Sequence, residues 1–160
     1  MNSGERIRFE AGKKEHVDTV LSMMSGLEDA DPGPTPFDEP RRRRSWATFV
    51  ADGSLGKAWV ICEGERPIGY VVLTFGFSFE YGGRDAFVDG LYVDEKYRGR
   101  GIGRRAMEFV EAQAREIGVR AVHLEATHGN EPALELYRRL GYFAHERFLM
   151  TKWLTPEEKI

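Results

Sequence analysis

Residues 86–110, AFVDGLYVDEKYRGRGIGRRAMEFV, limit the possible folds more than any other stretch of the sequence. Their first part has the aromatic and branched side chains of a buried strand, namely Phe87, Val88, Leu91, Tyr92 and Val93. Apolar residues then recur at three- and four-residue intervals, at Ile102, Ala106, Phe109, Val110 and Ile117. This second pattern predicts an amphipathic helix, which Gly118 would end as a left-handed cap. The stretch therefore predicts a strand, a tight turn and a helix in direct succession.

The turn between this strand and this helix is rich in glycine and arginine. It contains Gly99, Gly101 and Gly103, which let the backbone approach a ligand closely. The first N–H groups of the following helix and the positive end of its dipole point at the same place, which suits a phosphate or pyrophosphate group. Positive charge is added by Arg98, Arg100 and Arg104.

Two common phosphate-binding loops do not fit this turn. A P-loop ends in Gly-Lys-Ser/Thr, which is absent. The dinucleotide fingerprint requires the spacing G-x-G-x-x-G, whereas Gly99, Gly101 and Gly103 are each two residues apart. The pattern that remains, Arg-x-x-Gly-x-Gly, resembles the acetyl-CoA signature of the GNAT superfamily of N-acetyltransferases.

A second motif strengthens this resemblance. Asn130, Ala133, Tyr137 and Gly141 match the Asn-x-x-Ala-x-x-x-Tyr-x-x-x-Gly-Phe segment of the same superfamily, with Tyr142 in place of the usual Phe. Both motifs occur in the expected order, separated by a helix and a strand. The strand before the first motif is similar to that of the spermidine/spermine acetyltransferase branch.

The resemblance implies a mixed α/β (α+β) fold in a single domain, residues 1–160. We expect a mostly antiparallel central sheet of six to seven strands with a splayed central pair, flanked by about four helices. The patterns along the chain agree with this order of elements. They predict strands at 7–10, 57–63, 67–79, from 86 onward, at 121–127 and 144–153, and helices from 15 onward, at 39–51, from 102 and at 132–140.

The resemblance also implies that acetyl-CoA is the co-substrate. Its pyrophosphate would lie on the turn and the first helical residues, Arg98, Gly99, Arg100, Gly101, Ile102, Gly103 and Arg104. Its pantetheine arm would pair with the backbone of Leu91, Tyr92 and Val93 and contact Asn130, Ala133 and Tyr137. Asn130 is also a natural helix cap. Gly90 indicates a bulge in the strand.

Two residues are candidates for proton transfer. Asp89 is an acid within the apolar strand, at the position where the spermidine/spermine branch has a glutamate. Because aspartate is shorter, we expect it to act through a water molecule or by orienting the amine. Asp85 and Glu125 are alternative bases. The phenol of Tyr137 would protonate the departing thiolate.

The expected reaction is direct acetyl transfer, in a ternary complex, to a primary amine of a small cationic acceptor such as a polyamine or diamino acid. An acidic loop containing Glu28, Asp29 and Asp31 could attract such an amine, and Asp89 would bind it as well. An aminoglycoside or a protein amino group is an alternative acceptor. A CoA-binding regulatory or interaction module without turnover is a different class of function that the motifs also allow.

Composition narrows the remaining choices. The net charge of -3 argues against a nucleic-acid binder, and no apolar run is long enough to cross a membrane. The polar first residues and the single Cys62 lead us to expect a cytoplasmic protein without a disulfide, and the four histidines lack metal-ligand spacing. The run 41–44, four arginines, fits either a solvated helix face or a site for CoA phosphates or an anionic partner. The family resemblance implies a homodimer.

Overall fold

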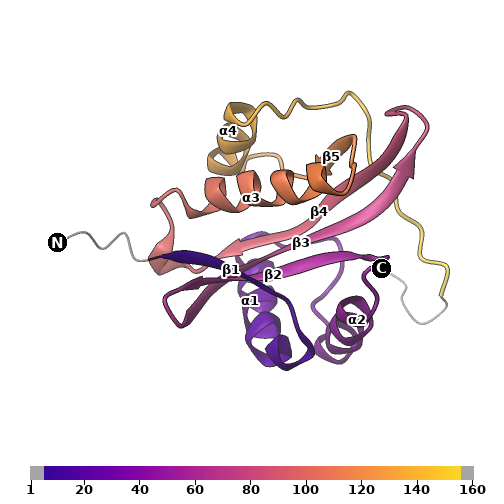
Figure 1. The fold of residues 1–160 in the computed structure, drawn as a ribbon. Coiled ribbons are helices and arrows are strands. Elements are labelled where there is room, and N and C mark those ends of the chain that lie inside the picture. The colour runs from indigo at the N-terminus through magenta and orange to yellow at the C-terminus, as the bar shows by residue number, and fades with distance from the viewer. Residues whose placement is uncertain (1–5, 156–160) are drawn as a thin grey trace.

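The computed structural model describes residues 6–155 as a five-stranded sheet with helices packed on both faces (Figure 1). Helices α1 (Val17–Ala30) and α2 (Glu39–Ala51) lie on one face, and helices α3 (Ile102–Glu116) and α4 (Glu131–Arg139) lie on the other. Short 3-10 turns precede α1 at Lys14–His16 and α3 at Glu95–Tyr97. Within residues 6–155, no helix has the length and apolar character needed to span a bilayer.

The strands follow one another across the sheet in chain order. They are β1 (Ile7–Ala11), β2 (Gly56–Glu63), β3 (Arg66–Ser78), β4 (Gly83–Val93) and β5 (Ala121–Leu124). Neighbours from β1 to β4 are antiparallel, whereas β5 runs parallel to β4. Helix α3 provides the crossover that a parallel pair requires.

The prediction of six to seven strands is wrong for the described residues, which form five. The predicted strand at 144–153 is an extended segment outside the sheet, because no neighbouring strand pairs with it. Strand β5 ends at Leu124 rather than at 127, since Thr127 instead accepts the N–H of Asn130 in a turn and donates its hydroxyl to Asp31. The ends of the predicted 1–160 domain lie outside the described residues.

Two apolar layers hold the helices against the sheet. On the α3 face, Leu73, Met107 and Val110 are completely buried. On the α1 and α2 face, the layer contains Val20 and Trp46, whose indole N–H donates to the carbonyl of Lys13 over 3.0 Å. Each pair of helices therefore packs against apolar side chains from the face of the sheet that it covers.

Strand β4 changes its surroundings halfway along its length. Its pairing with β5 runs from Asp85 to Val88 and ends there, so residues 89–93 continue with only β3 beside them. This matches the expected splayed pair. In the register with β3, Val72 pairs with Gly90 and Leu73 pairs with Val88, which leaves Asp89 as an extra residue. The bulge expected near Gly90 is therefore present, and it lies where the two strands separate.

Candidate active site

Beyond Val88 and Leu124, β4 and β5 are no longer paired, and we call this unpaired region beside residues 89–93 the opening. The start of α3 borders it. A 3-10 turn and residues 98–101 connect β4 to this helix, and the guanidinium of Arg98 donates to the carbonyl of Val93 over 2.8 Å. The side chain of Ile102 is buried in the apolar layer beside Leu91. These contacts hold the first turn of α3 next to the end of β4.

The glycine-rich turn has the geometry of an anion cradle. Gly99 and Gly101 both have φ of 74°, in the left-handed region that glycine adopts at little cost. A Cβ atom built at either position would meet no heavy atom within 4 Å, so nothing in the chain fills the concave side. Gly101 is the N-cap of α3 and provides no side chain to bond the first N–H groups. These groups and the helix dipole fit a pyrophosphate.

The three predicted arginines contribute less free charge than expected. Arg98 bonds the carbonyl of Val93, Arg100 pairs with Glu63, and Arg104 pairs with Glu108 one turn along α3. Their guanidinium groups are thus partly neutralised or engaged on the protein. We infer that the backbone of the cradle, rather than these side chains, is its main anion-binding element.

Helix α4 brings the second motif to the same region. Asn130 caps this helix, as predicted, with its side-chain oxygen accepting the N–H of Ala133 over 3.4 Å. Leu136 lies against the first turn of α3, because a Cβ atom at Gly103 would be 3.6 Å from it. The two sequence motifs therefore pack against one another.

Tyr137 is half-buried on α4. Burial raises the pKa of its phenol, and the charge of Asp31 raises it further. The hydroxyl consequently remains protonated at neutral pH, as a proton donor requires. Its ring lies edge-on to Tyr142, with 6.0 Å between the ring centroids.

Asp89 lies in different surroundings from those the sequence predicted. We expected an acid within apolar core, but the bulge turns Asp89 outward and its side chain is exposed. It remains close to the opening. Its charge and that of Glu28 both raise the pKa of the buried Tyr70 phenol, where burial is the main cause, whereas Arg42 acts in the opposite direction.

The C-terminal end of α1 extends the acidic surroundings across the opening. Glu28 accepts the N–H of Gly33 over 3.0 Å, and Asp31 accepts the hydroxyl of Thr127 over 2.7 Å. The charge of Glu28 reaches Tyr70 on β3, and Asp31 is near Thr127, which follows β5, and near Tyr137. Asp29 is exposed, and no contact connects it to the opening. Of the predicted loop acids, Glu28 and Asp31 are held in place by hydrogen bonds.

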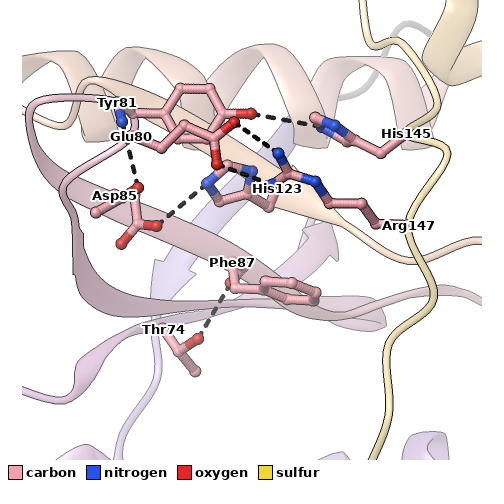
Figure 2. Close-up of polar contacts among 9 residues, drawn as sticks. Thr74, Glu80, Tyr81, Asp85, Phe87, His123, His145 and Arg147 are labelled. Atoms are coloured by element: carbon pink, nitrogen blue, oxygen red, sulfur yellow. Dashed lines mark hydrogen bonds and ion pairs between the residues drawn. The ribbon is translucent and has the colours of Figure 1, made fainter.

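A second polar group lies along the paired part of β4 and β5 (Figure 2). His123 Nε2 is 3.2 Å from Asp85 Oδ2, and both side chains are about four-fifths buried. The ring of Tyr81 lies 4.9 Å from that of His123. The predicted alternative base Asp85 is thus paired, and His123 is a possible proton acceptor that the sequence reasoning passed over. No local sequence signal indicated this contact, because it depends on the register between β5 and β4.

A cavity beside β5 includes Tyr137 in its wall but lies apart from the predicted cradle. It measures about 640 Å³ and lies along the outer side of β5. Its walls include Val122, Leu124, Tyr137 and Tyr142. The segment after α4 contributes Phe143, Ala144, His145, Arg147 and Leu149. None of the cradle residues 98–104 lines it.

The four arginines of 41–44 do not form one free basic patch. Arg43 pairs with Asp18 and Glu39, and the guanidinium of Arg41 lies over the ring of Trp153 at 5.4 Å. Arg42 is half-buried and its charge reaches Tyr70. Much of this run is therefore used in packing α2.

Comparison with known proteins identifies relatives of this chain. The model of the acetyltransferase (GNAT) family matches residues 21–142. Thialysine N-epsilon-acetyltransferase of Bos taurus is 32% identical over 79 residues, which are 49% of this chain and 46% of that protein. The chain thus spans about half the length of this curated relative.

Solved structures share the fold over almost the full length. An integron cassette protein, HFX_CASS3, from the mobile metagenome of Cole Harbour Salt Marsh has a TM-score of 0.78 and 30% identity, covering 96% of this chain and 93% of that one. Aminoglycoside N-acetyltransferase AAC(6')-Iy, solved in complex with CoA, has a TM-score of 0.77 and 14% identity, covering 95% and 97%. At that identity the second likeness concerns the fold alone.

Proposed function

The chain belongs to the GNAT acetyltransferase family, and we propose that it transfers the acetyl group of acetyl-CoA to a primary amine of a small cationic acceptor. One observation carries the proposal. The uncapped, glycine-rich start of α3 packs against α4, which carries Tyr137, and it follows β4, which carries Asp89 just after its pairing with β5 ends. This arrangement provides an anion cradle, an open strand edge and two proton-transfer groups in one region.

The donor would be held mainly by backbone groups. The N–H groups at the start of α3 bind the pyrophosphate, and the open edge of β4 at Leu91–Val93 pairs with the amide groups of the pantetheine arm. When bound, acetyl-CoA supplies an activated acetyl group as a thioester. The same β4 N–H groups can stabilise negative charge that develops on the thioester carbonyl oxygen.

The amine would enter from the acidic side of the opening. Alkylamines are protonated at neutral pH, so Glu28, Asp31 and Asp89 would attract them. Asp89, directly or through a water molecule, then accepts the proton that the amine must lose to become nucleophilic. The protonated phenol of Tyr137 returns a proton to the sulfur that leaves. The Asp85–His123 pair is a second possible base, favoured by its 3.2 Å contact.

The acceptor class rests on this cluster of acids. A small polyamine or diamino acid matches it, and the name of the bovine relative, thialysine N-epsilon-acetyltransferase, is consistent with an amine of this kind. Aminoglycosides and protein amino groups are the competing acceptors. A CoA-binding module without turnover is the competing function, and it makes no use of either Asp89 or Tyr137.

Release of free CoA from acetyl-CoA across a panel of polyamines, diamino acids, aminoglycosides and peptides tests the proposal. We expect turnover with small cationic amines and a roughly 100-fold lower kcat/KM for Asp89→Asn, on the scale of general-base effects. If His123→Gln lost activity while Asp89→Asn kept the native activity, His123 rather than Asp89 would be the general base. Binding of acetyl-CoA without acetylation of any amine would contradict an enzymatic function for this panel.

A further inference from the structure

A buried tyrosine with an unused hydroxyl lies in the layer between the sheet and helices α1 and α2. Tyr70 on β3 is only 3% exposed. Within residues 6–155 its hydroxyl makes no hydrogen bond, yet the oxygen is not sealed from solvent. Buried polar groups are almost always hydrogen-bonded, because an unpaired group loses its bonds to water without replacement. An enclosed ring whose unpartnered hydroxyl reaches solvent therefore indicates a place for a ligand group.

Two glycines leave the space that directs this hydroxyl to the bulge in β4. A Cβ atom at Gly90 would lie 3.0 Å from the ring of Tyr70 and 3.2 Å from its oxygen. The ring of Tyr92 is stacked 6.3 Å from that of Tyr70, and its own oxygen would be 3.0 Å from a Cβ atom at Gly26 on α1. The Tyr70 hydroxyl is thus held against the residue that follows Asp89, where the pairing of β4 with β5 has ended.

Arg42 on α2 brings a positive charge to the same layer. It lies one helical turn before the buried Trp46, so it shares the helix face that packs on the sheet beside Tyr70 (Figure 1). Arg42 is half-buried, and among the described residues its guanidinium makes no ion pair or hydrogen bond. The adjacent Arg43, in contrast, is paired with two carboxylates. A half-buried arginine without a carboxylate partner can accept one from a ligand.

Charges of both signs act on the Tyr70 hydroxyl. Burial is the main cause of the raised pKa of this phenol, the positive charge of Arg42 opposes the rise, and the negative charges of Asp89 and Glu28 add to it. The phenol therefore keeps its proton at neutral pH and can donate a hydrogen bond to an anion. One cation and two anions around a hydroxyl donor match a ligand with one carboxylate and two ammonium groups. A ligand with ammonium groups alone would bring a like charge toward Arg42.

We propose that Arg42 and the Tyr70 hydroxyl bind the carboxylate of the acceptor, so that the substrate is a free diamino acid, acetylated on its side-chain amine, rather than a polyamine. This assignment rests on the proposed function and narrows its acceptor. A guanidinium binds a carboxylate through two parallel hydrogen bonds, and the phenol adds a third donor. Glu28 and Asp89 would attract the ammonium groups. A polyamine would leave both Arg42 and Tyr70 unpaired.

The transfer needs no further reactant. The side-chain amine nitrogen forms a bond to the acetyl carbonyl carbon, and the carbon–sulfur bond of the thioester breaks with its electron pair on sulfur. The ammonium gives up two protons in total, which pass to solvent through Asp89, directly or through water. Tyr137 gives one proton to the thiolate and regains one from solvent. The products are an N-acetylated diamino acid, CoA and one proton, and Arg42 and Tyr70 act only on binding of the acceptor.

Matched acceptors that differ only by the carboxylate test the proposal. L-Lysine is compared with cadaverine, and L-ornithine with putrescine, by release of free CoA from acetyl-CoA. In at least one pair we expect kcat/KM of the native protein to be at least about tenfold higher for the diamino acid, on the scale of lost charge-assisted hydrogen bonds. Arg42→Gln should remove this preference through a higher KM for the diamino acid. Tyr70→Phe should weaken the preference about threefold, as expected for one hydrogen bond.

Arg44→Gln is the matched control. It makes the same chemical change on an exposed side chain of the same helix, and the native preference should persist. Calorimetry should give equal affinities of native protein and Arg42→Gln for acetyl-CoA. Weaker binding of acetyl-CoA to Arg42→Gln would assign Arg42 to the phosphates of CoA and overturn the proposal.

Calorimetry with CoA bound makes the test independent of turnover. The favoured diamino acid should bind native protein at least about tenfold more tightly than its matching diamine, and Arg42→Gln should lose this difference. Diamines that are acetylated as well as diamino acids, or a preference that Arg42→Gln retains, would overturn the carboxylate site and leave an amine acetyltransferase. Failure of both diamino acids to bind would overturn the site as well. Arg42-dependent binding of a diamino acid without release of CoA would support the site and contradict the proposed function.

Discussion

At the scale of single residues, the surroundings of Tyr137 and Asp89 differ sharply. Burial and the charge of Asp31 raise the pKa of the Tyr137 phenol, so the hydroxyl carries its proton at neutral pH and can donate a hydrogen bond or a proton to a departing thiolate. Asp89 is exposed on a bulge, where it can reach both solvent and an entering amine. One group is thus suited to donate a proton and the other to accept one.

Substitution of Tyr137 by Phe should lower kcat at least tenfold while changing the dissociation constant of acetyl-CoA by less than about twofold, because only proton donation is lost. Steady-state kinetics and calorimetry measure the two effects. Tyr142→Phe is the matched control, since it removes the hydroxyl of the adjacent ring, which bonds Glu111. We expect it to reduce thermal stability but not kcat. Equal kcat in native protein and Tyr137→Phe would remove Tyr137 from the mechanism.

The acidic loop provides a second matched pair. Asp31→Asn should raise KM for a cationic acceptor about threefold to fivefold, as expected for loss of a screened charge interaction of up to about 1 kcal/mol. Asp29→Asn makes the same chemical change on an exposed side chain without contacts to the opening, and KM should not change. Because the effect is electrostatic, the difference should shrink at high salt. If KM rose equally in both variants, the acceptor would not bind next to Asp31.

The sequence predicted the chemistry of these residues better than their positions. The Asn130 cap could be predicted because capping depends on adjacent residues. The exposure of Asp89 could not, since a bulge changes which face a side chain occupies and depends on the partner strand. The contact between His123 and Asp85 depends on the parallel register of β5 with β4, which no local pattern determines.

At the scale of elements, α3 connects the fold to the site. Its apolar face packs against the sheet, and its uncapped start borders the opening. Gly101 is the N-cap of this helix, and Gly118 follows its C-terminal end; the two glycines have nearly the same φ, 74° and 78°. They offer a test that separates ligand binding from backbone strain.

Gly101→Ala and Gly118→Ala should each destabilise the protein by about 1–2 kcal/mol, because both force a left-handed conformation on alanine. Only Gly101→Ala should also weaken acetyl-CoA binding, by about tenfold or more, since its Cβ would occupy the cradle. Chemical denaturation gives the stabilities and calorimetry gives the affinities. If both variants bind acetyl-CoA equally well, the cradle is not the pyrophosphate site.

Elements with strong local patterns were predicted well. The bounds of α2 match residue for residue, and the strand, turn and helix around the cradle are present. The segment 144–153 was predicted as a strand, but a strand also needs a neighbour in the sheet. Among the described residues no strand pairs with this segment. Such a neighbour depends on the three-dimensional fold, which local sequence does not determine.

At the scale of the whole molecule, stability depends on the sheet holding two helical layers together. Leu73 is completely buried at the centre of β3, in the layer that contacts α3. Leu73→Ala should reduce the free energy of unfolding by about 2–5 kcal/mol, as expected for an unfilled cavity. Leu55→Ala, at a 41% exposed position, should change it by less than about 0.5 kcal/mol. Urea denaturation compares them, and equal effects would contradict this description of the core.

The location of the acetyl-CoA site is the central claim, and hydrogen–deuterium exchange with and without acetyl-CoA tests it most directly. We predict slower exchange in residues 89–93 at the open edge of β4, in residues 99–104 at the start of α3 and in residues 130–137 of α4. Exchange at β5 and residues 143–149, beside the cavity of about 640 Å³, should not change. Protection confined to β5 and residues 143–149, with 99–104 unchanged, would contradict the account and place acetyl-CoA in that cavity.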